Sequence, residues 1–258
     1  MDWPTDLFGF AVALVISVVT APAGVSGAVF LLPVQLSVFH VANPAVTPTN
    51  LLFNVVAGPG ALARYARHGS LWSPLAGVLV LGTLPGVVLG AITRVYFVAD
   101  PDLFRLCAAA VLGPLGLWLI VSRRGRVTAV RTLRRRWILL LALGAGFVGG
   151  IYGIGGGSLL GPILVGTGLS VAVVAPATLL STFVTSVAGC LTYAVLSFTA
   201  PGDVAPDWSL GIACGVGGLI GGYAGAAIQP RLPEQLLRRV LGSLAVALAV
   251  LYAVQAAA

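Results

Sequence analysis

Residues 152–162 read Tyr-Gly-Ile-Gly-Gly-Gly-Ser-Leu-Leu-Gly-Pro, and residues 23–33 read Ala-Gly-Val-Ser-Gly-Ala-Val-Phe-Leu-Leu-Pro. The two stretches align without a gap at an offset of 129 residues. Each interrupts a long apolar run with closely spaced glycines and reaches a proline a few residues later. The same interruption at equivalent places in the two halves of the chain indicates an internal repeat.

Further pairs follow in the same order along the chain. Pro-Thr-Asn-Leu-Leu at 48–52 matches Pro-Ala-Thr-Leu-Leu at 176–180 at an offset of 128. The remaining pairs are Tyr65 with Tyr193, the glycines Gly82, Gly86 and Gly90 with Gly217, Gly221 and Gly225, and residues 101–105 with residues 233–238. These matches predict a first repeat in residues 1–121 and a second in residues 137–258, joined by a basic linker in residues 122–136.

Composition places both repeats in a membrane. The 258 residues are 59% hydrophobic and only 8% charged, whereas an average soluble domain carries about 25% charged residues. Residues 7–63 and 137–202 contain no charged side chain, so water could not solvate the surface of such a fold. We therefore predict an all-α polytopic membrane protein with two transmembrane repeats, embedded in a lipid bilayer.

Each repeat divides into about five helical segments where glycine, proline or charged residues interrupt the apolar runs. The segments are residues 7–23, 27–41, 45–66, 72–96 and 102–121 in the first repeat and 137–152, 156–169, 171–197, 209–228 and 235–256 in the second. The first two of each repeat are short and meet at the glycine-rich break. At about 1.5 Å per residue they are shorter than a ~30 Å hydrocarbon core, so we expect either re-entrant hairpins or short full spans.

Arginine placement predicts the orientation. All 14 basic residues are arginine, and seven of them lie in residues 122–136, which the excess of positive charge on cytoplasmic loops places in the cytoplasm. Twelve arginines, all but Arg94 and Arg105, then share that side, whereas six of the seven acids lie opposite. The loop that carries Arg64 and Arg67 falls inside, and its acidic counterpart in the second repeat falls outside. The repeats are therefore expected to have inverted topology, with both termini outside.

The same composition excludes several classes of protein. Without lysine there is no phosphate-loop lysine and no Schiff-base lysine, and two histidines with no acid inside an apolar run do not make a metal site. Cys107, Cys190 and Cys214 match no ligand spacing and are expected to be small core residues. The arginines of one short loop fit a membrane flank better than nucleic acid. We predict no catalytic residues, no cofactor, no metal and no nucleic-acid partner.

Inverted repeats are a transporter architecture in which the substrate lies between the halves and broken helices direct their positive N-terminal ends at anionic groups. Glycine also lets a ligand approach bare backbone N–H groups. The candidates for binding a small anionic substrate at the breaks are Gly24, Ser26 and Gly27 in the first repeat and Gly153, Gly155, Gly156, Gly157 and Ser158 in the second. Close helix packing is the alternative role of these glycines. It is the role that we expect for the series at 82, 86 and 90 and at 217, 221 and 225.

The third segment of each repeat adds a polar face. At about 100° per residue, Asn50, Asn54 and Arg64 lie on one side of the first of these helices, and Thr178 and Thr182 occupy the matching positions of the second. Such a row of amides and hydroxyls is typical of the wall of a polar cavity. Hydrogen bonds between helices are the alternative role of the amides and hydroxyls. For Arg64 the alternative is a boundary position that keeps its charge in water.

At the glycine breaks and the segments after them, the sequence resembles the sulfite exporter TauE/SafE family of membrane permeases. The matching stretches are residues 153–162 and their degenerate copy at 24–33, followed by Thr-Asn-Leu-Leu-Phe-Asn at 49–54 and Thr-Leu-Leu-Ser-Thr at 178–182. The resemblance covers essentially the whole chain. The sequence departs from the family pattern in the first break, where Ser26-Gly27-Ala28 stands in place of three consecutive glycines.

The resemblance implies a secondary transporter that exports a small sulfur-containing anion, such as sulfite or an organosulfonate, across the bacterial inner membrane. Alternating access of two inverted halves is the mechanism expected from the repeat. A passive anion channel is the alternative, because the spans contain no acidic residue that would couple transport to an ion. An intramembrane enzyme is less favoured, since the sequence offers no nucleophile–base pair.

Overall fold

The computed structural model describes residues 3–67, 69, 71–97, 106, 109–110, 113–114, 116–118, 120–121, 134–167, 169–199 and 204–257. The described α-helices are α1 (Trp3–Thr20), α2 (Ala28–Ser37), α3 (Val46–Ala66), α4 (Pro74–Tyr96), α6 (Arg135–Tyr152), α7 (Gly156–Gly166), α8 (Val171–Leu196), α9 (Trp208–Ile228) and α10 (Glu234–Ala257). Two single turns of 3-10 helix follow α1 and α9, at Ala21–Ala23 and Gln229–Arg231. The predicted basic linker lies outside the described residues up to 133, as does part of the segment predicted at 102–121.

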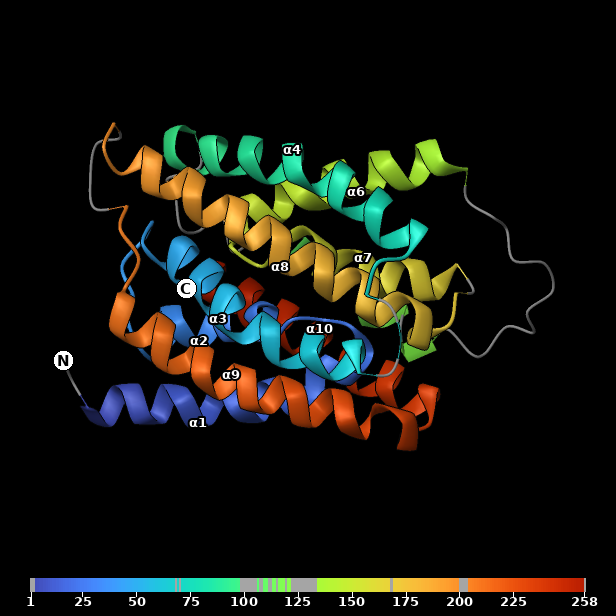
Figure 1. Ribbon diagram of the computed structural model, residues 1–258. Helices are drawn as coiled ribbons and strands as arrows, with labels where there is room; N and C mark the ends of the chain where they lie inside the picture. The colour runs from blue at the N-terminus through green and yellow to red at the C-terminus, as the bar shows by residue number, and fades with distance from the viewer. Residues whose placement is uncertain are drawn as a thin grey trace.

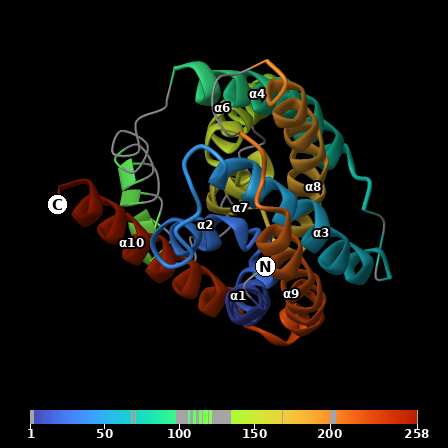
Figure 2. The same ribbon diagram turned by 90° about the vertical axis from the view of Figure 1, so that its left-hand side faces the viewer.

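The long helices α1, α3, α4, α6, α8 and α9 run roughly along one common direction (Figure 1), whereas α10 crosses this direction at the edge of the bundle (Figure 2). α1 packs against α9, α9 against α3, α3 against α8, α8 against α4, and α4 against α6. The two short helices join this series where α2 packs on α3 and α7 packs on α8. An end-on view shows α3 and α8 between the α1–α9 pair and the α4–α6 pair (Figure 2). α3 and α8 are therefore the central helices at which the two halves of the chain meet.

Among the described residues, five helices are long and apolar enough to cross a membrane, and they lie at Trp3–Ala23, Pro74–Tyr96, Arg135–Tyr152, Val171–Leu196 and Trp208–Arg231. This corrects the expectation that the first two segments of each half are short. Only α2, with 10 residues, and α7, with 11, are short, and at about 1.5 Å per residue each covers roughly half of a ~30 Å core. α1 and α6 are longer because they begin at Trp3 and Arg135, before the uncharged runs start.

Glycines set the distance between the outer helix pairs. A methyl group built on Gly86 of α4 would lie 2.3 Å from the carbonyl oxygen of Leu143 in α6. A methyl group on Gly217 of α9 would lie 2.2 Å from the carbonyl oxygen of Phe10 in α1. The neighbouring glycines of both series are equally crowded. The packing role expected for the two series is confirmed, because any side chain there would push two backbones apart.

Replacing Gly86 by alanine should destabilise the protein, because α4 and α6 must separate to admit the methyl group. Overpacking of this kind costs about 1–3 kcal/mol. Gly77→Ala is the matched control, since Gly77 lies on the same helix and a methyl group there meets nothing within 4 Å. Thermal unfolding in detergent should show a lower Tm for Gly86→Ala alone, and equal Tm values for the two variants would contradict the packing role.

Candidate functional site

Both chain breaks depend on glycine in a left-handed backbone conformation. After α1 the chain turns at Gly24 (φ 77°), and after α6 it turns at Gly153 (φ 69°), values that glycine adopts without steric cost. Neither position has room for a side chain. A methyl group on Gly24 would lie 2.5 Å from Cα of Ala175, and one on Gly153 would lie 2.3 Å from the carbonyl oxygen of Thr47. The first break therefore rests on α8 and the second on α3.

The two breaks meet at a central polar cluster formed by Ser26, Asn54, Ser158 and Thr182. The N–H of Ser26 donates to Oγ of Ser158 at 3.3 Å, and the Ser26 hydroxyl donates to Oδ1 of Asn54. Oγ of Ser158 lies 3.2 Å from Oγ1 of Thr182. Nδ2 of Asn54 donates to the carbonyl oxygen of Gly153 at 3.4 Å. All four side chains of the cluster are at most 9% exposed, so both breaks are tied to α3 and α8 at one buried place.

Asn50 and Thr178 bind the backbone on either side of the central polar cluster. Nδ2 of Asn50 donates to the carbonyl oxygen of Ala28 at 2.9 Å, and Oγ1 of Thr178 donates to that of Gly24 at 2.8 Å. Both side chains are fully buried, and Oδ1 of Asn50 has no hydrogen-bond partner among the described residues. The polar faces predicted on the third segments therefore do converge on the breaks.

Arg64 is the one residue predicted on these faces that lies apart from the others. It occupies the last turn of α3 and is half-buried. Ten residues of helix separate it from Asn54, which corresponds to about 15 Å along the axis. Helical periodicity predicts a shared face for Arg64 and Asn54, but the rise per residue moves Arg64 well away from the cluster.

The other glycines of the breaks lie against neighbouring helices as closely as those of the packing series. A methyl group on Gly157 would lie 2.0 Å from the carbonyl oxygen of Thr178. One on Gly155, which has a φ of 70°, would lie 2.6 Å from a methyl carbon of Thr182. Gly27 and Gly156 have neighbours within 3 Å of the same position. Close packing is therefore one role of these glycines, and ligand contact by their N–H groups stays a prediction.

The starts of α2 and α7 both lie at the central polar cluster. Their N-cap residues are Gly27 and Gly155, which have no side chain, and in α2 the N–H of Ala28 donates to Oγ of Ser26 at 3.2 Å. A helix start carries a partial positive charge that favours an anion. Backbone N–H and side-chain O–H donors thus converge without an acidic side chain among them. Among the described residues, no three His, Cys, Asp or Glu come together as a metal site would require.

Arg94 is a buried charge for which the sequence predicted no role. It lies near the end of α4 with 1% of its surface exposed, and it donates hydrogen bonds to Asn43 and, at 3.4 Å, to Oγ1 of Thr47. Thr47 in turn donates to the carbonyl oxygen of Ile151 at 3.2 Å, so Arg94 is connected to the second break. An ionisable residue buried in a membrane segment is a candidate functional residue. The one feature of the sequence that sets Arg94 apart is its predicted position on the side of the membrane opposite to most other arginines.

The bond from Thr178 to Gly24 can be tested with two equivalent substitutions on α8. Thr178→Val removes a hydrogen bond between helices and should destabilise the protein by roughly 0.6–1.7 kcal/mol. Thr185→Val is the control, because Thr185 is equally buried but donates only to carbonyl oxygens of its own helix, at 2.7 Å to Ser181. Unfolding in mixed detergent micelles measures both variants, and a loss of the same size in each would argue against a special role for the bond to Gly24.

Comparison with known proteins agrees with the resemblance seen in the sequence. The family model described as "Sulfite exporter TauE/SafE" matches residues 9–252. Two curated relatives from Xylella fastidiosa, of strains Temecula1 and 9a5c, are each described as a probable membrane transporter protein. Each is 28% identical over 256 residues, which cover 95% of this chain and 90% of the relative. No solved structure matches the chain. The chain therefore belongs to the sulfite exporter TauE/SafE family and is a multi-pass membrane transporter.

Proposed function

We propose that this chain is a secondary transporter that exports a small sulfur-containing anion, such as sulfite or an organosulfonate, by alternating access of two inverted repeats. The observation that carries the proposal is the central polar cluster, where the starts of two short helices meet among neutral donors. Positive helix ends and hydroxyl groups suit an anion. The family supplies the class of substrate.

The packing of the helices supports two inverted repeats. The first helix of each proposed repeat packs against the fourth helix of the other, α1 against α9 and α6 against α4. Hydrogen bonds repeat in the same way within the fold: the Tyr65 hydroxyl donates to the carbonyl oxygen of Ala21 at 3.3 Å, and the Tyr193 hydroxyl donates to that of Gly150 at 3.0 Å. These two bonds join residues that are related by the offsets found in the sequence.

The hydroxyl groups of the cluster can donate hydrogen bonds to an anion while remaining uncharged. A serine or threonine hydroxyl both donates and accepts, and it rotates to suit its neighbours. Ser158 and Thr182 are bonded to each other in this structure, and both are buried. We infer that this is an occluded arrangement. Opening of one side would separate α7 from α8 and free the two hydroxyl groups to donate to the substrate.

Transport can be measured in proteoliposomes loaded with radiolabelled sulfite or sulfoacetate. We expect saturable, protein-dependent efflux of at least one of them, with counterflow. Ser158→Ala should slow efflux about tenfold or more, because a hydrogen bond to a charged ligand contributes roughly 1.5–3 kcal/mol. Thr185→Val is the control for a buried hydroxyl outside the cluster. No flux of either anion would refute the substrate, and flux without saturation or counterflow would identify a passive channel.

The inverted topology predicts that two equivalent loops lie on opposite sides of the bacterial inner membrane. Gly69, between α3 and α4, should face the cytoplasm together with the arginine-rich linker, whereas Thr199, after α8, should lie outside with both termini. A methyl group on Gly69 meets nothing within 4 Å, and Thr199 is exposed, so cysteine fits at both positions. In a background without the native cysteines, an impermeant thiol reagent added to whole cells should label Thr199→Cys only. Labelling of both or of Gly69→Cys alone would contradict this topology.

A further inference from the structure

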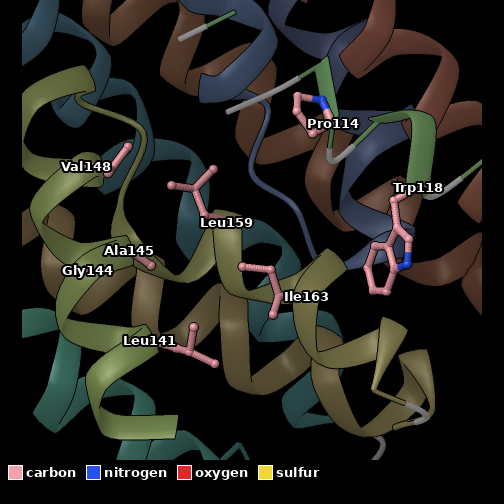
Figure 3. A pocket seen from close by; sticks show the side chains of 8 residues that line it. All are labelled: Pro114, Trp118, Leu141, Gly144, Ala145, Val148, Leu159 and Ile163. Atoms are coloured by element: carbon pink, nitrogen blue, oxygen red, sulfur yellow. The ribbon is translucent and has the colours of Figure 1, made fainter. Parts of the chain in front are cut away.

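A cavity of about 470 Å³ lies beside α6 and α7 (Figure 3), and none of the four residues of the central polar cluster lines it. Its walls are apolar side chains from α6, from α7 and from the part of the chain that contains Trp118. The cavity is open to the surroundings of the protein, because Leu141 and Trp118 at its edge are 38% and 40% exposed. α6 is one of the helices able to cross a membrane. The medium outside this opening is therefore lipid hydrocarbon.

Gly144 is an exposed residue in the wall of the cavity. Nothing lies within 4 Å of a methyl group built on it, whereas one on Gly146, two residues further along α6, would lie 2.3 Å from the carbonyl oxygen of Thr83. The glycines of α6 therefore have two different functions. Gly146 lets α4 approach, and Gly144 leaves an empty space on another side of the helix. In hydrocarbon such a space must be filled, because unfilled walls lose their dispersion contacts.

The same face of α6 leads from the cavity to a group of arginines. Trp137, Leu141, Gly144 and Val148 are spaced three or four residues apart and so share one side of the helix. Trp137 is 52% exposed, and the exposed residues 134–136 directly before it are all arginine. The guanidinium of Arg136 lies 5.9 Å from the centre of the Trp137 ring. Tryptophan at the level of lipid headgroups, next to basic residues, is typical of a membrane interface.

The distances agree with the dimensions of a phospholipid. From residue 134 to residue 148, α6 extends about 21 Å, which is about two thirds of a ~30 Å hydrocarbon core. An acyl chain lying in the cavity would therefore place its headgroup at the arginines. Basic pockets between membrane helices attract anionic headgroups.

We propose that this cavity holds one acyl chain of an anionic phospholipid whose phosphate group binds the arginines at the start of α6. The binding site depends on the insertion of the protein in a membrane and on no property of the transported substrate. It is independent of the proposed transport function.

Native mass spectrometry of the purified protein tests the proposal. We expect one retained phosphatidylglycerol per chain and about tenfold weaker retention of phosphatidylcholine with the same acyl chains. A methyl group on Gly144 meets nothing within 4 Å, so Gly144→Leu should occupy part of the cavity and reduce phosphatidylglycerol binding about tenfold. Gly77→Leu on α4 is the matched control, since Gly77 also has nothing within 4 Å. Unchanged lipid binding in Gly144→Leu would overturn the proposal.

Two further measurements separate the parts of the site. Replacing Arg134, Arg135 and Arg136 by glutamine should abolish the preference for phosphatidylglycerol, and a preference that persists would refute the headgroup contact. A phosphatidylglycerol with a photoreactive acyl chain should label the peptide that contains residues 141–148 in the wild-type protein, which requires no variant to fold. Absence of this label would overturn the proposal. A lipid-free dimer that Gly144→Leu dissociates would show that a second copy of the chain fills the cavity instead.

Discussion

Two interruptions of helix inside a membrane protein end the regular series of backbone hydrogen bonds, and an unpaired carbonyl group in hydrocarbon costs several kcal/mol. In the described structure, carbonyl groups at and beside both breaks accept hydrogen bonds from side chains of other helices. The carbonyl oxygens of Ala21, Gly24, Ala28, Gly150, Ile151 and Gly153 accept from Tyr65, Thr178, Asn50, Tyr193, Thr47 and Asn54, in that order. All six donors lie on α3 or α8. Hydrogen bonds to the two breaks therefore help to fix the positions of α3 and α8.

This constraint also explains why the polar residues of the chain are so few and so concentrated. A hydroxyl or amide group that donates a hydrogen bond to a carbonyl oxygen offsets the cost of burying both groups. The same hydroxyl or amide group facing lipid would have no partner and would be unfavourable. The glycines complete the arrangement, because the donors reach the carbonyl groups only if the helices approach closely. Close helix packing and the hydrogen bonds to the breaks therefore depend on each other. The convergence of donors at the cluster follows from both, and it is the basis of the anion site that we propose.

Much of this fold could be predicted from the sequence, for identifiable reasons. The repeat, the breaks and the packing glycines are visible because each depends on residue type and spacing alone. The lengths of α1 and α6 were underestimated, because helix continues through Trp3 and Arg135, outside the uncharged runs. Arg64 shares a helical face with Asn54 yet lies too far along the axis to join it. The burial of Arg94 depends on Asn43 and Thr47, and no periodicity within one segment reveals a contact between segments.

A hydrogen bond that joins the two halves of the chain, from Thr178 to Gly24, has a consequence for folding during synthesis. Tyr65 and Asn50 bind carbonyl groups of their own half of the chain, so these contacts can form soon after the third helix enters the membrane. The carbonyl group of Gly24, however, waits for Thr178, and α1 waits for α9. A ribosome that has synthesised only the first half has therefore produced an intermediate with exposed polar backbone and an uncovered row of small residues. The native packing is therefore completed only after α8 and α9 have been made, and a chain that stalls before α8 lacks both the partner of the Gly24 carbonyl group and the helix that covers α1.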